Sequence, residues 1–328
     1  MPRHPQIVQY ELALTASDGA ASYDVGVGFI HKSLCIAGLP HRVPAPHTEN
    51  VASFERRGKG WNLQMITPNL TIPDSDISIP IGVPYGPRAR LLIIWLASQA
   101  RQSSSRCIEI GPIKQWLREI GVGIGGDAIN KAKEQLIKIS NTSFNISVRD
   151  SMFGADDVYF RRDNFVEANV LAVEDLMNLK RGALNEVRWP TGVILTENAW
   201  SRFRSPESLP IPMNRLRAIA DSAIAIDVFL YLSYQLPIIP EGTEMVMPWK
   251  QYHTHFGLVG THAQNCRIRQ NAQQPIMAAL RAYPEAQIEV TDRGLVMRRS
   301  RPADFSPTMV SMSPTGRRNK RHEVKMIA

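Results

Sequence analysis

Two runs of cationic and amide side chains have the residue types and the helical spacing needed to form hydrogen bonds with the edges of DNA bases. The first run contains Asn130, Lys131, Lys133 and Lys138, and the second contains Arg267, Arg269, Gln270 and Asn271. In the major groove, Asn and Gln can bond adenine bidentately, and Arg or Lys can bond guanine. Each run lies along a predicted amphipathic helix, so we expect its polar side to face solvent.

Further arginines follow each run on a predicted β-hairpin. They are Arg149, Arg161 and Arg162 after the first run, and Arg293, Arg298 and Arg299 after the second. Beside a base-reading helix, such side chains would hold phosphates, which set the register of a protein on DNA without reading its sequence. The two patches as groups are therefore candidates for a DNA-binding site.

Other motifs with chemical meaning have weak support. Gly121, Gly123 and Gly126 have the spacing of a dinucleotide-binding fingerprint, but a predicted helix precedes them where the fingerprint needs a strand. His253 and His255 would point about 200° apart on a helix, so they cannot share a metal, and we expect His253 in the core. The phosphate-binding pattern GxxxxGK[ST] does not occur. We therefore expect no cofactor, no metal and no enzymatic activity.

Composition predicts a globular protein with a polyanionic partner. The chain has 328 residues, 44% of them hydrophobic, and a net charge of +8, and residues 263–328 hold 12 Lys or Arg against 5 Asp or Glu. No apolar run approaches the roughly 20 residues that span a bilayer, and the first residues lack a signal peptide's apolar segment. We expect a cytoplasmic protein with no membrane contact.

The three cysteines lie too far apart for a metal knuckle, and we expect them to be small buried residues.

The clearest organisational feature is an internal repeat. The segment around Trp95 aligns with the segment around Tyr231, 136 positions later, and the same offset pairs Pro112 with Pro248 and Gly121 with Gly257. The alignment keeps helix phase over two successive elements. Such self-similarity predicts two copies of one structural unit.

Each copy is predicted to contain three helices and a hairpin. In the first copy these are a helix from Gly86 to about Gln102, a short helix between Pro112 and Gly121, a third helix after Gly126, and a hairpin over 143–148 and 158–162. In the second copy they are a helix from Asp221 or Ser222 to Leu236, a short helix ending near Phe256, a helix over 263–282 that Pro275 kinks or divides, and a hairpin over 287–290 and 295–297.

This order predicts an α+β chain of two tandem winged-helix domains. We expect an N-terminal extension over 1–80, the first domain over 81–204, the second over 205–301, and a disordered basic tail over 302–328. Two modules in tandem could span adjacent major grooves about one helical turn apart. The sequence therefore predicts a long DNA site.

Several segments resemble the plasmid-encoded RepA-type replication initiators. They are Leu39-Pro40-His41-Arg42, Gly82-Val83-Pro84-Tyr85-Gly86-Pro87-Arg88-Ala89-Arg90-Leu91-Leu92, Gly125-Gly126, Ala225-Ile226-Asp227-Val228-Phe229-Leu230-Tyr231-Leu232, Phe256-Gly257 and Tyr283-Pro284-Glu285-Ala286. The resemblance covers roughly residues 30–300. Residues 103–105 and 261–262 depart from the pattern, which leaves the start of each recognition helix open.

The resemblance implies a protein that binds repeated double-stranded DNA at a plasmid origin. It also implies recruitment of the host initiator and replicative helicase, control of copy number, and a homodimer that exchanges with a monomer. Two alternatives stay open from the residues alone: a transcription repressor with the same fold, and a rolling-circle nicking initiator.

Overall fold

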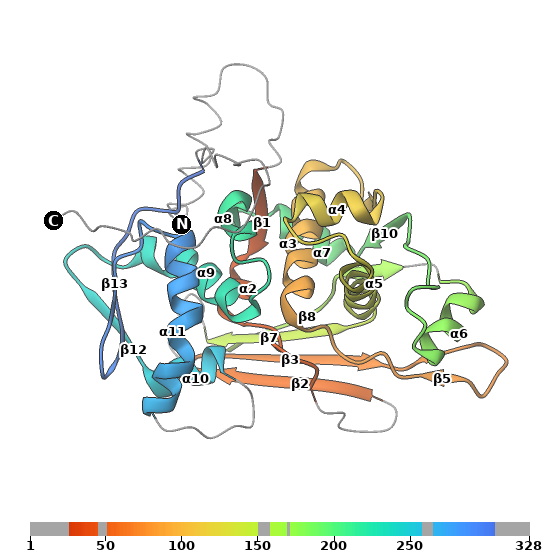
Figure 1. The fold of residues 1–328 in the computed structure, drawn as a ribbon, viewed down its shortest axis with the longest axis horizontal. Coiled ribbons are helices and arrows are strands. Elements are labelled where there is room, and N and C mark those ends of the chain that lie inside the picture. The colour runs from red at the N-terminus through yellow and green to blue at the C-terminus, as the bar shows by residue number, and fades with distance from the viewer. Residues whose placement is uncertain (1–25, 45–50, 150–157, 169–170, 258–264, 306–328) are drawn as a thin grey trace, which may run out of the picture.

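The computed structural model describes residues 26–44, 51–149, 158–168, 171–257 and 265–305. They form helices packed over several small antiparallel sheets, which confirms the α+β class (Figure 1). The predicted tail beyond residue 305 lies outside these residues. Among the described helices, none combines the length and apolar character that a bilayer-spanning segment needs.

The first copy of the repeat has its three helices where the sequence predicts them. They are α3 (Gly86–Gln102), α4 (Ile113–Glu119) and α5 (Gly126–Ser140), with strand β6 (Cys107–Glu109) between α3 and α4. Helix α3 is buried on most of its circumference because its apolar side chains are distributed all round it. Gly121, with φ +76°, provides the left-handed residue after α4.

The second copy repeats this order. Its elements are α9 (Ala223–Gln235), a 3₁₀ turn (Leu236–Ile238), β12 (Glu244–Pro248), α10 (Trp249–Phe256), α11 (Asn265–Ala282), β13 (Ile288–Val290) and β14 (Gly294–Arg298). The Ser222 hydroxyl accepts a hydrogen bond from the Ala225 amide and so caps α9. Helix α11 continues through Pro275 and is not divided there, contrary to one of the two predicted outcomes.

The first hairpin forms as predicted but belongs to a larger sheet. Strands β7 (Ser143–Arg149) and β8 (Val158–Asn164) join β2 (Val51–Gly58) and β3 (Trp61–Pro68) in the order β2-β3-β7-β8. A second sheet has the order β6-β10-β9, from β9 (Val166–Ala168) and β10 (Gly192–Leu195), which matches the order β12-β14-β13 in the second copy. The structural counterpart of β13–β14 is therefore β9–β10. Helix α6 (Val173–Arg181) separates these two strands and hides the equivalence in the sequence.

The described residues before α3, 26–44 and 51–85, share sheets and core with both copies. Strand β1 (Val27–His31) pairs with β11 (Ser208–Pro212), and α2 (Lys32–Ile36) packs against α9. The remaining elements are β4 (Leu70–Thr71), β5 (Ser78–Ile79), α7 (Glu197–Arg204) and α8 (Met213–Arg217). One hydrophobic core includes buried residues of β1, α3, α9 and α11. It continues across the predicted boundaries at residues 80 and 204.

Two expectations about burial are wrong. Cys35 is buried as predicted, but Cys107 and Cys266 are exposed. In α10, His255 is buried and His253 is only half-buried. Strand β2 packs against α10, and the Trp61 ring lies 4.8 Å from the His255 ring, so the N-terminal sheet creates a second buried side on this helix.

Candidate nucleic-acid interface

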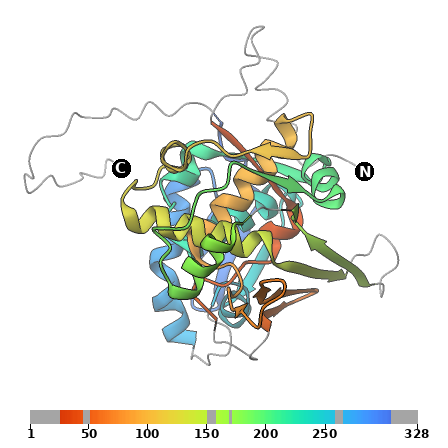
Figure 2. The ribbon, with the colours of Figure 1, turned by 90° about the vertical axis from the view of Figure 1, so that its right-hand side faces the viewer.

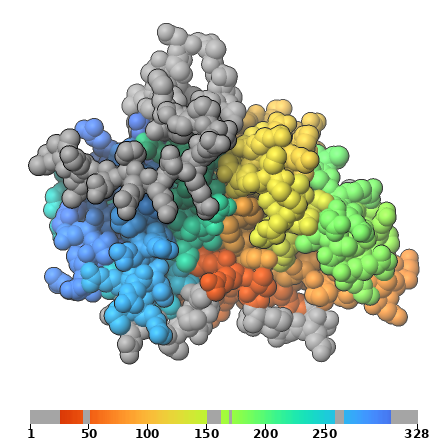
Figure 3. All heavy atoms as spheres, viewed as in Figure 1, coloured from red at the N-terminus to blue at the C-terminus, as the bar shows by residue number. Residues whose placement is uncertain are grey.

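Helix α11 presents an open polar face. Its inward side consists of buried Ile268, Ala272, Ile276 and Ala279, which pack toward α9 and α10. Its outward side carries the four predicted residues, all exposed: Arg267, Arg269, Gln270 and Asn271. The predicted orientation of this helix is confirmed. In Figure 3 its surface is the light-blue ridge at the lower left.

The turn between β13 and β14 adds charge beside this helix. Arg293 is exposed in the turn, and Asp292 next to it forms an ion pair with Arg269 of α11. The pair links the helix to the hairpin, and both partners are largely solvent-exposed. Arg267 and Arg293 are exposed cations of this face that take no part in that pair.

Arg298 and Arg299, also predicted to hold phosphates, are paired with carboxylates. The Arg298 Nε lies 2.7 Å from Glu244 Oε1, and its Nη2 lies 3.1 Å from Glu289 Oε2, across the three strands of the sheet. The Arg299 Nη1 lies 3.8 Å from Glu241 Oε2. A phosphate would have to compete with these carboxylates, so both arginines are weaker candidates than Arg293.

The third helix of the first copy, α5, is only partly open. Asn130 is half-buried, and Lys131 is exposed and forms an ion pair of 2.7 Å with Asp127. Lys133, predicted to face outward, is instead buried and donates hydrogen bonds to the carbonyls of Leu184 and Asn185 at 3.2 and 3.3 Å. The segment after α6 covers this side of α5, and the resulting burial lowers the pKa of Lys133.

Lys138 is the second lysine of α5 that the sequence placed wrongly. It is buried, its Nζ lies 2.7 Å from Glu134 Oε1, and it lies 4.5 Å from the centre of the Tyr85 ring. The Tyr85 hydroxyl donates to the same Glu134 carboxylate at 3.1 Å. These contacts fasten α5 to the start of α3. Lys138 therefore supports the fold and does not face solvent.

The predicted cations of the first hairpin lie on the four-stranded sheet. Arg149 at the end of β7 and Arg162 on β8, opposite Asn145, are both exposed. For Arg161 only the backbone pairing with Ile146 is described. Figure 2 shows this hairpin extending from the body of the molecule at the lower right. Arg149 and Arg162 are open to a ligand, although they lie outside the sheet that corresponds to β12-β14-β13.

A buried polar cluster joins the two copies, and the sequence reasoning missed it. Arg90 of α3 makes two hydrogen bonds to the Asp227 carboxylate of α9, at 2.5 and 2.6 Å. Arg90 also donates to the carbonyls of Leu39, Pro40 and Gly86, at distances between 2.6 and 3.1 Å. A charged residue inside each of two apolar helices was the signal that could have revealed the pair.

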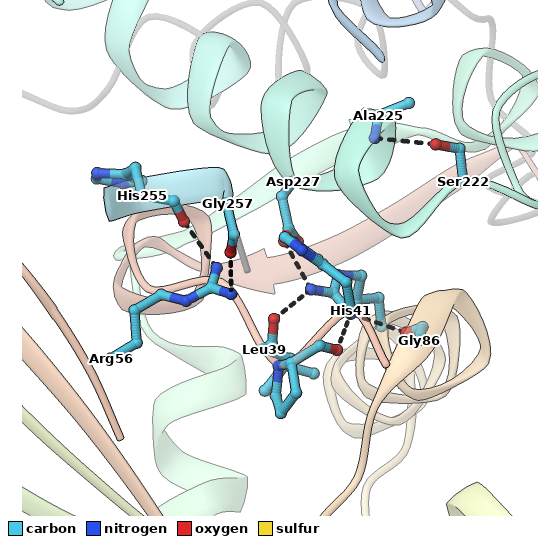
Figure 4. Close-up of polar contacts among 11 residues, drawn as sticks. Leu39, His41, Arg56, Gly86, Ser222, Ala225, Asp227, His255 and Gly257 are labelled. Atoms are coloured by element: carbon cyan, nitrogen blue, oxygen red, sulfur yellow. Dashed lines mark hydrogen bonds and ion pairs between the residues drawn. The ribbon is translucent and has the colours of Figure 1, made fainter. Parts of the chain in front are cut away.

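His41 completes this cluster. Its Nε2 donates to Asp227 Oδ2 at 3.1 Å (Figure 4). Burial alone would raise the pKa of Asp227, but the charge of Arg90 and the hydrogen bonds from His41 and Arg90 hold it well below its usual value. Burial also lowers the pKa of His41 to about 4, so the ring is neutral near pH 7. The motifs around residues 39–42, 82–92 and 225–232 thus meet at one place in the fold.

A second arginine, Arg56 of β2, lies beside this cluster. It donates to the carbonyl of His255 at 2.7 Å and to that of Gly257 at 3.0 Å, at the end of α10 (Figure 4). Here and elsewhere among the described residues, no three His, Cys, Asp or Glu side chains gather closely enough to hold a metal ion. The buried cluster has the composition of a structural junction.

Comparison with known proteins gives one family match. A family model described as the plasmid-encoded RepA protein matches residues 83–251, which is more than half of the chain and extends from the start of α3 into α10. No curated protein matches the sequence.

Two solved structures are similar to this chain. One is a crystal structure of selenomethionine derivatives of domains 2 and 3 of RctB, with a TM-score of 0.47 and 11% identity, covering 78% of this chain and 88% of that chain. The other is a crystal structure of RctB domains 2-3, with a TM-score of 0.47 and 13% identity, covering 80% of this chain and 85% of that chain.

Proposed function

The chain belongs to the plasmid-encoded RepA family, and on that premise we propose that it is a replication initiator that binds repeated double-stranded DNA at a plasmid origin. The observation that carries the proposal is the exposed face of α11, which offers Arg267, Gln270 and Asn271 from a helix anchored in the core. These are side chains that bond guanine and adenine edges. Arg293, beside this face, would hold a phosphate.

In this proposal both copies are winged helices with unequal roles. Two features support that interpretation. Each copy has a helix, a strand, two helices and then two further strands, and the sheet orders β6-β10-β9 and β12-β14-β13 correspond. Helix α11 reads bases. The first copy contacts phosphates through Lys131, Arg149 and Arg162, because most of its third helix is covered. Neutralising a phosphate contact weakens binding to all sequences alike.

Family membership also underlies our proposals about partners. We propose that the bound protein recruits the host initiator and replicative helicase in the cytoplasm, and that exchange between a homodimer and a monomer controls plasmid copy number. No side chain of the described residues is assigned to these contacts.

The proposal is tested by binding of the purified full chain to labelled duplexes that tile the non-coding DNA of its parent plasmid. We expect one region to bind about a thousandfold or more tighter than a shuffled duplex. Asn271→Ala should lower that specific affinity roughly tenfold, since one bidentate pair contributes about 1–3 kcal/mol of discrimination. The control Gln102→Ala changes an exposed amide at the end of α3, outside the proposed interface, and should have no effect. Equal binding to all duplexes would refute the proposal, and a single operator palindrome would favour a repressor.

A further inference from the structure

Two buried arginines connect α9 and α10, the helices that pack against α11, to the rest of the molecule. Helix α11 packs against α9 and α10. Arg90 of α3 holds α9 through Asp227, and Arg56 of β2 holds the end of α10. The four-stranded sheet and the first repeat are thereby connected to the helix that carries the exposed Arg, Gln and Asn side chains.

Arg56 contacts the C-terminal end of α10, where the backbone carbonyls of a helix lack hydrogen-bond donors. The carbonyls in the last turn of a helix have no donor within the helix, and they form the negative end of its dipole. Arg56 supplies two donors, to His255 and to Gly257, from a planar group that can satisfy both at once. It is only 3% exposed, so it cannot contact DNA itself. Burial lowers its pKa to about 10, which leaves it charged at neutral pH.

The surroundings of Gly38 show that Arg56 and the Arg90–Asp227 pair form a single cluster. A Cβ at this position would lie 2.7 Å from Asp227 Oδ2 and 3.2 Å from Arg56 Nη1. The chain at Gly38 passes between Asp227 and Arg56 with no room for a side chain. A displacement of either residue would therefore displace the other through this segment.

We propose that Arg56 is a positioning residue for base recognition, acting by fixing the helix that leads into α11. The proposal rests on the function of α11 proposed above. Hydrogen bonds to base edges require close geometry, whereas contacts of long cationic side chains with phosphates tolerate small displacements. Loosening the end of α10 should therefore reduce sequence discrimination more than overall affinity for DNA.

The test compares Arg56→Gln with the wild-type full chain on the preferred duplex and on a shuffled duplex, at a temperature where circular dichroism shows both proteins folded. We expect the ratio of specific to non-specific affinity to fall by about tenfold. Non-specific affinity and its salt dependence should not change. Arg56→Lys keeps the charge and one donor group, and it should recover part of the ratio.

Arg57→Gln is the matched control. Arg57 is the next residue on the same strand, faces solvent with its side chain 76% exposed, and is paired with Glu55. The Arg57→Gln variant should leave the ratio of specific to non-specific affinity unchanged.

An unchanged ratio in folded Arg56→Gln would overturn the positioning role, and so would an equal loss on both duplexes. If Arg56→Gln does not fold, Arg56→Lys is measured in its place, and an equal loss of affinity on both duplexes there would overturn the role. Failure of the wild-type chain to prefer any duplex would instead refute the proposed function.

Discussion

At the scale of single residues, burial decides which cations support the fold and which can meet a ligand. Lys133 and Lys131 lie two positions apart on α5, yet the first is buried and donates to two backbone carbonyls, whereas the second is exposed. On α11 the candidate Arg, Gln and Asn side chains all face solvent, because the inner side of this helix is apolar. Residue type alone could not distinguish these cases, since the covering segment after α6 is remote in sequence.

The exposed arginines should determine the salt dependence of DNA binding. We expect the double variant Arg267→Ala, Arg293→Ala to flatten the plot of log affinity against log salt by about 1 unit, because Arg293 holds a phosphate and each phosphate contact contributes roughly 0.9 units. The comparison pair Arg298→Ala, Arg299→Ala should change the slope less, because those side chains are already paired with glutamates. Fluorescence anisotropy at several salt concentrations measures both. Equal slopes for the two double variants would contradict these assignments.

The buried histidines should make stability depend on pH. Burial lowers the pKa values of His41 and His255 to about 4, below their ordinary value near 6.5. As pH falls, the unfolded chain takes up these protons first, so stability is full above pH 6.5 and is lost as pH falls toward 4. Each histidine contributes up to about 2 kcal/mol to the loss between pH 7 and pH 5.

Substitution of one histidine tests this dependence. We expect His41→Gln to show a smaller difference in unfolding free energy between pH 7 and pH 5 than the wild type, as measured by urea denaturation. The same difference in both proteins would show that His41 does not titrate as proposed.

At the scale of elements, the hairpin of the second copy depends on a close strand approach. Gly294 starts β14 with φ +151°, and a Cβ there would lie 2.1 Å from the Met247 carbonyl oxygen of β12. We expect Gly294→Ala to cost about 3 kcal/mol or more of unfolding free energy, because backbone would have to move. Gly242→Ala is the control: its φ is +72°, but nothing lies within 4 Å, so the expected cost is about 1–2 kcal/mol. Urea denaturation giving equal costs would contradict the tight β12–β14 pairing.

Local periodicity predicted the elements better than their pairing. The apolar stripe of α4 and the glycine after it placed that helix within a residue or two, because both signals are local. The pairing of β7 with β3 could not be inferred in the same way, since β3 lies about 80 residues earlier and carries no signal of its register. The Arg90–Asp227 junction was missed for the same reason, although charges within apolar helices marked both ends.

At the scale of the whole molecule, the two repeats form one body with candidate DNA contacts at both ends. Figure 3 shows α11 at the left and the yellow α4–α5 region at the right of the same face. The Arg90–Asp227 pair and Arg56 connect these regions through the core. We therefore propose that such a body binds a long DNA site with a fixed arrangement of contacts.

The most direct test is a footprint of the full chain over the non-coding DNA of the parent plasmid, with methylation interference at guanine N7 to locate contacts in the major groove. We predict several protected blocks repeated at intervals of about one to two helical turns, with interference that weakens in the Arg267→Ala variant. Uniform protection without preferred sites, or interference that is unaffected by this substitution, would contradict base reading by α11.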